Sequence, residues 1–248
     1  MLTEKRIAVL IDADNVSDKY IQHILDEVSN FGTATYKRIY GDWTKPALSS
    51  WKSVLLDNSI TPIQQYGYTT GKNATDSAMI IDAMDILYSD NVEGFCIVSS
   101  DSDFTRLAVR LRESGKYVVG MGEKKTPGAF ISACNKFKYL EVLEKSAELV
   151  NPTEPDGMTH ESVVQMTTLD TVKKSIITIV DEISDEDEWV PIAEVGNRLQ
   201  KRFPDFDVRN YGFSKLTPFV KSLSIVEINS IPNERNGNNK LVYVRLKN

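Results

Sequence analysis

Five aspartates lie where an apolar segment ends or a predicted helix begins, namely Asp12, Asp14, Asp76, Asp101 and Asp103. Asp12 directly follows the apolar run 7–11, and Asp101 comes shortly after the apolar run 95–98 of the predicted strand 95–99. Ligands of an open α/β sheet bind at the carboxyl ends of its strands. If these two runs are neighbouring parallel strands, several carboxylates therefore converge on one place.

Carboxylates that converge repel one another, and some of them hold protons unless a cation neutralises them. A hard divalent cation such as Mg²⁺ takes oxygen ligands and keeps bound waters. One or two such ions would polarise a phosphodiester, generate hydroxide and stabilise the leaving oxygen. The residue types and their positions thus indicate hydrolysis of a phosphodiester without a covalent intermediate.

Some of these aspartates also have simpler interpretations. Asp101 could cap a helix, and Asp103 could stabilise a helix N-terminus through its charge. Asp82 follows Asp76 on the same predicted helix, but it lies roughly 240° further round the helix axis. It therefore points to a different place, and we interpret it as a structural residue.

Alternating apolar runs and amphipathic stretches must position these aspartates. Apolar residues predict strands at 7–11, 33–40, 61–65, 95–99 and 117–120. Helical spacing predicts a helix between each pair of successive strands, beginning near 17, 48, 75 and 104. This βα alternation predicts an α/β fold with a Rossmann-like, mostly parallel sheet and helices on both faces.

The C-terminal part of the chain predicts a second, smaller domain. Residues 151–170 show no sustained periodicity, which is typical of a linker. Three predicted helices and two short strands follow, at 171–183, 191–203, 216–223, 225–228 and 241–244. Three helices and a hairpin are typical of a winged-helix α+β domain. We therefore expect a first domain at 1–145, a linker at 146–170 and a second domain at 171–248.

The composition excludes several classes of protein. Apolar residues make up 41% and charged residues 26% of the 248 residues, as in a folded chain rather than a disordered one. The two cysteines, Cys96 and Cys134, are too few for a disulfide scaffold and suit a reducing compartment. No stretch approaches the roughly 20 apolar residues of a membrane helix, and the apolar run before Asp12 is too short for a signal sequence. We expect a cytoplasmic protein with no membrane partner.

The net charge of −6 is unevenly distributed along the chain. Residues 1–140 sum to −1, residues 141–188 to −10 and residues 189–248 to +5. An acidic chain in general argues against a polyanionic partner. Here the acidic residues lie in the middle segment and the C-terminal part is basic, so the net charge does not exclude a polyanionic partner.

Three segments resemble the motifs of the NYN domain, a PIN-like nuclease family that includes LabA-like bacterial proteins. They are IDADN around Asp12, KNATDSAMIIDAMD at 72–85 and SSDSDFTRLAVRLRE at 99–113. The resemblance covers about 5–140 and implies the fold of a metal-dependent ribonuclease.

The resemblance also assigns roles to individual residues. It implies that Asp12, Asp76 and Asp101 hold Mg²⁺ or Mn²⁺ and act in catalysis, with Asp103 as a further catalytic residue close by. The asparagine of the first motif corresponds to Asn15, which would orient either the substrate or Asp12.

A second resemblance concerns residues 189–223, which are similar to the OST-HTH (LOTUS) module. The sequence PDFDVRNYGFSKL, at 204–216, is its most distinctive part. That module is a winged helix implicated in RNA binding. The two resemblances together imply a nuclease domain and an RNA-binding domain on one chain.

Cations and aromatic side chains in the predicted loops suit an RNA partner, single-stranded or structured. Proteins that bind unpaired bases stack them on aromatic rings and hold the phosphates with cations. The candidates for such contacts, beside Asn15, are Trp43, Lys45, Tyr68, Lys72, Lys125, Arg209, Tyr211 and Lys215. Trp43 and Tyr68, and likewise Tyr66, could equally be ordinary packing residues.

Two other functions remain open. One is an RNA-binding regulatory adaptor without catalytic activity. The other is a phosphatase like the haloacid dehalogenases, because the sequence Asp12-Ala13-Asp14 after a strand resembles their first motif, in which the first acid attacks phosphorus. The residues after Asp14 differ from that motif. Dinucleotide binding is disfavoured, since the same loop lacks the glycines that let a pyrophosphate approach a helix.

Overall fold

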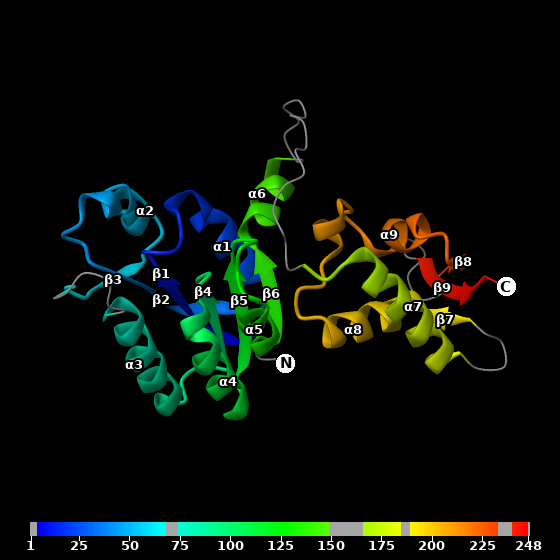
Figure 1. Cartoon of the computed structure of the whole chain (residues 1–248), viewed down its shortest axis with the longest axis horizontal. Coiled ribbons are helices and arrows are strands. Elements are labelled where there is room, and N and C mark those ends of the chain that lie inside the picture. The colour runs from blue at the N-terminus through cyan, green and yellow to red at the C-terminus, as the bar shows by residue number, and fades with distance from the viewer. Residues whose placement is uncertain (1–3, 68–73, 149–165, 185–188, 233–239, 248) are drawn as a thin grey trace. The chain divides into compact units, whose positions relative to one another are not determined.

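The computed structural model describes residues 4–67, 74–148, 166–184, 189–232 and 240–247 (Figure 1). The chain divides into two compact units, Met1–Gln165 and Met166–Asn248, which we describe one by one. Within the described residues, no helix combines the length and the apolar character that a membrane span needs.

A six-stranded sheet forms the centre of the first unit. Its strands lie in the order β3-β2-β1-β4-β5-β6, with bounds β1 Arg6–Asp12, β2 Thr33–Gly41, β3 Thr61–Gln64, β4 Gly94–Val98, β5 Tyr117–Gly122 and β6 Lys136–Tyr139. Every neighbouring pair in this sheet is parallel. The predicted Rossmann-like parallel sheet is thus confirmed. The strand order reverses between β1 and β4, and ligands bind at such a reversal, beyond the carboxyl ends of the strands.

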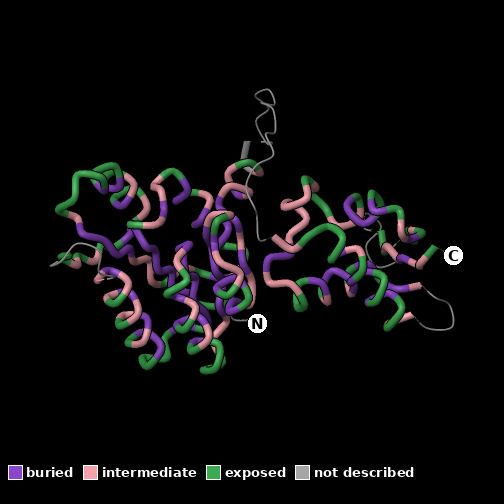
Figure 2. Tube along the Cα trace, in the orientation of Figure 1, coloured by how far each residue is buried: buried purple, intermediate pink, exposed green. Residues whose placement is uncertain are grey.

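Helices cover both faces of this sheet (Figure 1). Helices α1 (Ile21–Ser29), α2 (Trp51–Asp57) and α6 (Leu140–Glu148) contribute to one apolar core. Helices α3 (Ala74–Ser89), α4 (Thr105–Glu113) and α5 (Gly128–Ala133) follow the three strands β3, β4 and β5. The central strands are buried along most of their length (Figure 2).

The alternation of side chains along β1 decides where Asp12 points. Ile7, Val9 and Ile11 belong to the core shared with α1, α2 and α6. Successive side chains of a strand point to opposite faces. Asp12 therefore lies on the other face of the sheet, the face of α3.

Part of the first unit was not predicted. Strand β6 and helices α5 and α6 fall in a stretch for which the sequence analysis proposed no element. The strand β6 is only four residues long, lies at the sheet edge and alternates lysine with aromatic residues. Helix α5 has six residues and no charged residue in its first or last turn. Such short elements carry little periodicity.

The second unit contains three helices and a small antiparallel sheet. The helices are α7 (Leu169–Ile183), α8 (Ile192–Arg202) and α9 (Leu216–Ser222), and the strands are β7 (Val190–Pro191), β8 (Val226–Pro232) and β9 (Lys240–Leu246). The sheet order is β7-β9-β8. One apolar core joins all three helices to the sheet. The predicted winged-helix domain is confirmed.

The ends of the predicted linker are helical, since α6 runs to Glu148 and α7 begins at Leu169. Thr168 caps α7 by accepting a hydrogen bond from the amide of Thr171. Residues 149–165 lie outside the described part of the chain. Pro218 is the third residue of α9, where its missing amide hydrogen costs no helical hydrogen bond.

Candidate active site

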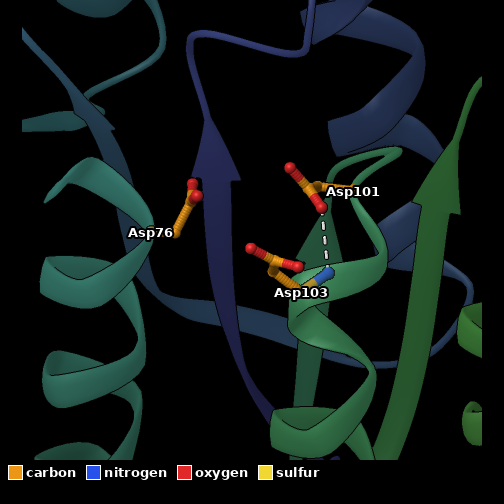
Figure 3. A group of neighbouring side chains, drawn as sticks. All are labelled: Asp76, Asp101 and Asp103. Carbon is orange, nitrogen blue, oxygen red and sulfur yellow. Dashed lines mark hydrogen bonds between the residues drawn. The ribbon is translucent and has the colours of Figure 1, made fainter. Parts of the chain in front are cut away.

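Three carboxylates meet at the carboxyl edge of the parallel sheet. They belong to Asp76, in the first turn of α3, and to Asp101 and Asp103, which follow β4. One oxygen from each lies within 4.8 Å of the others. Figure 3 shows the three side chains around the space between the start of α3 and the loop after β4. We call this group the acidic cluster.

The loop after β4 is shaped by Asp101 itself. Asp101 is the N-cap of the short 3₁₀ helix Ser102–Phe104, and its carboxylate accepts a hydrogen bond of 2.9 Å from the amide of Asp103. Side-chain oxygens are the usual acceptors at this position. The capping interpretation of Asp101 and its place in the acidic cluster are therefore compatible.

Asp12 lies close to the acidic cluster but is not a member of it. It is only 1% exposed. Its Oδ2 accepts hydrogen bonds of 2.7 Å from Ser99 Oγ and from Asn15 Nδ2, and its Oδ1 accepts one of 3.1 Å from the amide of Asp14. Burial raises the pKa of Asp12, while these hydrogen bonds oppose the rise. Asn15 thus orients Asp12, which is one of the two roles proposed for it.

Ser99 connects Asp12 to the acidic cluster, and the sequence analysis assigned it no role. Its buried hydroxyl donates to Asp12 and accepts a hydrogen bond of 3.0 Å from the amide of Asp101. A side chain at Gly122, on the neighbouring strand, would lie only 2.6 Å from the carbonyl oxygen of Ser99. The position directly after a continuously apolar strand was the available signal for Ser99.

The acidic cluster is electrostatically strained. Burial raises the pKa of Asp76 to about 6, and the negative charges of Asp12, Asp101, Asp103 and Asp14 add to the rise. An opposite charge among these carboxylates would favour their ionised forms. The site therefore has both the oxygen ligands and the excess negative charge that a hard divalent cation requires.

Asp82 lies on helix α3, as Asp76 does, but it has a structural role outside the acidic cluster. It pairs with Arg38 and accepts a hydrogen bond from the Tyr40 hydroxyl, so that it ties α3 to β2. Burial and the charge of Asp82 raise the pKa of Tyr40. This arrangement agrees with the structural interpretation of Asp82.

The candidate RNA contacts of the first unit lie in different surroundings. Lys45 is exposed and pairs with Asp14 over 3.2 Å, beside Asp12. Lys125, after β5, pairs with Glu123 over 2.7 Å. Trp43 is half-buried against the core, and its indole nitrogen donates to the carbonyl oxygen of Ile63. Tyr68 and Lys72 lie outside the described residues.

In the second unit, one of the three candidate RNA contacts is a cation that has no ion pair among the described residues. Lys215 is exposed at the start of α9. Arg209 forms an ion pair of 2.7 Å with Asp207. The ring of Tyr211 stacks on Phe219 at 5.1 Å, and its hydroxyl donates to the carbonyl oxygen of Thr167. The structure thus gives Tyr211 and Trp43 packing roles. For Trp43 this is the alternative interpretation that the sequence left open, whereas Tyr211 was expected only as an RNA contact.

The family model for the NYN domain matches residues 6–141, more than half of the chain. The chain belongs to the NYN domain family. The matched region contains Asp12 and the whole acidic cluster. A second family model, the OST-HTH/LOTUS domain, matches residues 167–237. The protein therefore joins a domain of a PIN-like nuclease family to a domain of an RNA-binding family, as both resemblances implied.

Two further comparisons concern the NYN part of the chain. An uncharacterized protein of Methanocaldococcus jannaschii is 29% identical over 143 residues, which are 55% of this chain and 55% of that protein. The chain thus spans about half the length of this curated relative. A crystal structure of a protein of unknown function from Vibrio parahaemolyticus is similar with a TM-score of 0.47 and 17% identity, covering 56% of this chain and 94% of that one.

Proposed function

We propose that this protein is a ribonuclease that depends on a divalent metal ion and hydrolyses phosphodiester bonds of RNA. The observation that carries the proposal is the acidic cluster, whose ligand oxygens lie within 4.8 Å of one another at the strand-order reversal of an NYN domain. The RNA substrate follows from the family of the second domain.

Three carboxylates suit Mg²⁺ or Mn²⁺, which prefer oxygen ligands. In this proposal Asp76, Asp101 and Asp103 hold the ion, and Asp12 lies close to them as a buried, hydrogen-bonded anion. The family resemblance implied metal binding by Asp12 and a neighbouring position for Asp103. The proposal therefore gives the role of metal ligand to Asp103 and the neighbouring position to Asp12. When bound, the ion supplies a Lewis acid for the phosphoryl group and lowers the pKa of water.

The residues around the acidic cluster hold it in place for this reaction. Ser99 fixes Asp12 and the backbone of Asp101 at once, and Asn15 donates a second hydrogen bond to the same Oδ2 of Asp12. Lys45 and Lys125 are exposed cations at the same edge of the sheet. Each would exchange its carboxylate partner for a phosphate of the bound RNA, because phosphates attract the same cations.

The burial of Asp12 disfavours the phosphatase alternative. An attacking aspartate has to reach the phosphorus atom of its substrate. Asp12 is 1% exposed, and both of its oxygens already accept hydrogen bonds.

Cys96 and Cys134 are free and buried, which suits the reducing cytoplasm that we propose as the location.

The proposed activity is tested with end-labelled single-stranded RNA, incubated with the full chain and Mn²⁺ or Mg²⁺, with and without EDTA. We expect cleavage that EDTA stops and that Asp76→Asn/Asp101→Asn abolishes. Asparagine keeps the capping oxygen at position 101. Asp85→Asn is the matched control, since Asp85 is an exposed aspartate of the same helix α3. Equal cleavage by the double variant and the control would refute the proposal. Tight binding of RNA without cleavage under all conditions would support the adaptor instead.

A further inference from the structure

A cavity lies at the edge of the sheet opposite the acidic cluster, where the strands begin. It has a volume of about 690 Å³, and its wall includes Lys5, just before β1, Tyr117, the first residue of β5, and Asn135, just before β6. Arg112 and Glu113, at the end of α4, complete one side. The acidic cluster lies at the carboxyl edge, so the two places are separate.

Several hydrogen-bond donors in this wall have no protein acceptor in the described residues. The exposed Lys5 side chain makes no ion pair or hydrogen bond there, and its Nζ lies 4.7 Å from the centre of the Tyr117 ring. Asn135 uses its Oδ1 to accept from the amide of Val118, which leaves the two hydrogens of its Nδ2 available.

The guanidinium of Arg112 is held in a fixed position. One nitrogen, Nη1, donates to the carbonyl oxygens of Ser132 and Ala133, at 3.3 and 3.1 Å. No other hydrogen bond of this side chain is found within the described part of the chain. Its remaining donors are therefore available to a ligand while these two hydrogen bonds are kept.

The charges around the cavity leave an excess of one cation. Glu93 is neutralised by Arg6, at 2.6 Å, and Lys116 by Asp90. Lys5 and Arg112 then face a single carboxylate without an ion pair among the described residues, that of Glu113. The C-terminus of α4 adds partial negative charge, which reduces this excess without reversing it.

We propose that this cavity binds one nucleotide unit, with its phosphate on Lys5, Arg112 and the Asn135 amide and its base against Tyr117. Charge-assisted hydrogen bonds from arginine and lysine are the strongest that a phosphate accepts. Aromatic rings stack with any base. The volume lies in the range of ordinary ligand pockets, about 300–1,000 Å³. The choice of a nucleotide over other anions rests on the RNA substrate of the proposed function.

The unit could come from a free mononucleotide or from an RNA strand, and photo-crosslinking distinguishes the two. The full chain is irradiated in EDTA with 4-thiouridine 5′-monophosphate or with a hexauridylate that carries one 4-thiouridine, and tryptic peptides are analysed. We expect label on the peptide that starts at Tyr117, after Lys116. Label from both probes indicates a free nucleotide, and label from the hexamer alone indicates a strand. The absence of label there with both probes would overturn the proposal.

A charge reversal with a matched control completes the test. Lys5→Glu should lower the labelling of this peptide at subsaturating probe by about tenfold, which corresponds to about 1.4 kcal/mol. Lys52→Glu makes the same change in charge at an exposed lysine of α2, away from the cavity, and should leave the labelling unchanged. Equal labelling of the two variants would overturn the proposal. Because the labelling is measured in EDTA, it does not depend on a metal ion at the acidic cluster, and its failure is distinguishable from a failure of the proposed nuclease activity.

Discussion

Neutralising Asp76 should make the metal-free protein more stable at pH 7 and should remove its response to Mg²⁺. The pKa of Asp76 is raised from 3.8 to about 6 by burial and by the neighbouring carboxylates. The folded state therefore binds this proton more tightly than the unfolded state. It follows that the ionised carboxylate destabilises the folded protein increasingly as the pH rises from about 4 to above 6.

The size of the effect follows from the same values. The rise from 3.8 to about 6 corresponds to at most about 3 kcal/mol at pH 7, at about 1.36 kcal/mol per pH unit. Asp76 is half-buried, so solvent screens part of this energy. We expect Asp76→Asn to gain about 1 kcal/mol at pH 7 and almost nothing at pH 4. This gain would raise the melting temperature by about 2–4 °C.

Mg²⁺ should reverse the order of stability. A ligand at one hundred times its dissociation constant stabilises a folded protein by about 2.7 kcal/mol. The wild type should therefore become the more stable protein once Mg²⁺ is added, whereas Asp76→Asn should hardly respond.

Thermal unfolding followed by tryptophan fluorescence measures these differences. Trp43 and Trp51 report on the NYN domain, and Trp189 lies in the second domain. Asp85→Asn, on the exposed face of α3, should behave like the wild type in both respects. The reasoning would be wrong if Asp76→Asn melted below the wild type at pH 7 without Mg²⁺, or if both gained equally from the ion.

Three further predictions concern other parts of the chain. Ser99→Ala should destabilise the NYN domain by about 1–3 kcal/mol, because Asp12 and the Asp101 amide each lose a buried hydrogen-bond partner. Urea unfolding measures this change, and a shift of the midpoint equivalent to less than about 0.5 kcal/mol would contradict the prediction. Asp82→Ala should cost about 2 kcal/mol, since Arg38 and the Tyr40 hydroxyl lose their shared acceptor, whereas the double variant Asp82→Ala/Tyr40→Phe should lose less than the sum of the two single changes. Deletion of 171–248 should weaken RNA binding and flatten its dependence on salt, with Mg²⁺ stabilisation of the NYN domain unaffected; an unchanged salt slope in a fluorescence titration would speak against an RNA-binding second domain.

The sheet and its acidic edge could be predicted from the sequence because buried parallel strands leave a strong signal. The runs at 7–11 and 95–98 are continuously apolar, and each is followed by polar residues, so their carboxyl ends were evident. Strand β6, with its lysines at Lys136 and Lys138, has no such run. Strand β6 is recognised by its pairing with β5, which only the folded chain reveals.

The roles of individual side chains were harder to predict than the place of the site. Spacing cannot tell which carboxylate reaches the cluster, since Asp12 is held back by Ser99 and Asn15, while Asp103 is brought in by the turn that Asp101 caps. The position of the Asp12 carboxylate thus depends on its hydrogen bond with Ser99, which follows the neighbouring strand β4. The packing of Tyr211 was likewise not predictable from local sequence, because its ring packs on Phe219 although the residues just before it are mostly polar.

Asp101 both belongs to the acidic cluster and caps the 3₁₀ helix after β4, and these two roles limit which substitutions evolution can accept at this position. Asp76 makes no hydrogen bond with another described residue, so a lineage that no longer needed catalysis could replace it freely. Asp101 also caps the turn that starts the next helix, so that its loss would be selected against even then. Descendants that have lost the reaction should therefore retain a short polar residue at position 101 long after position 76 has drifted. Asparagine at 101 together with an unrelated residue at 76 would be the expected trace of that history.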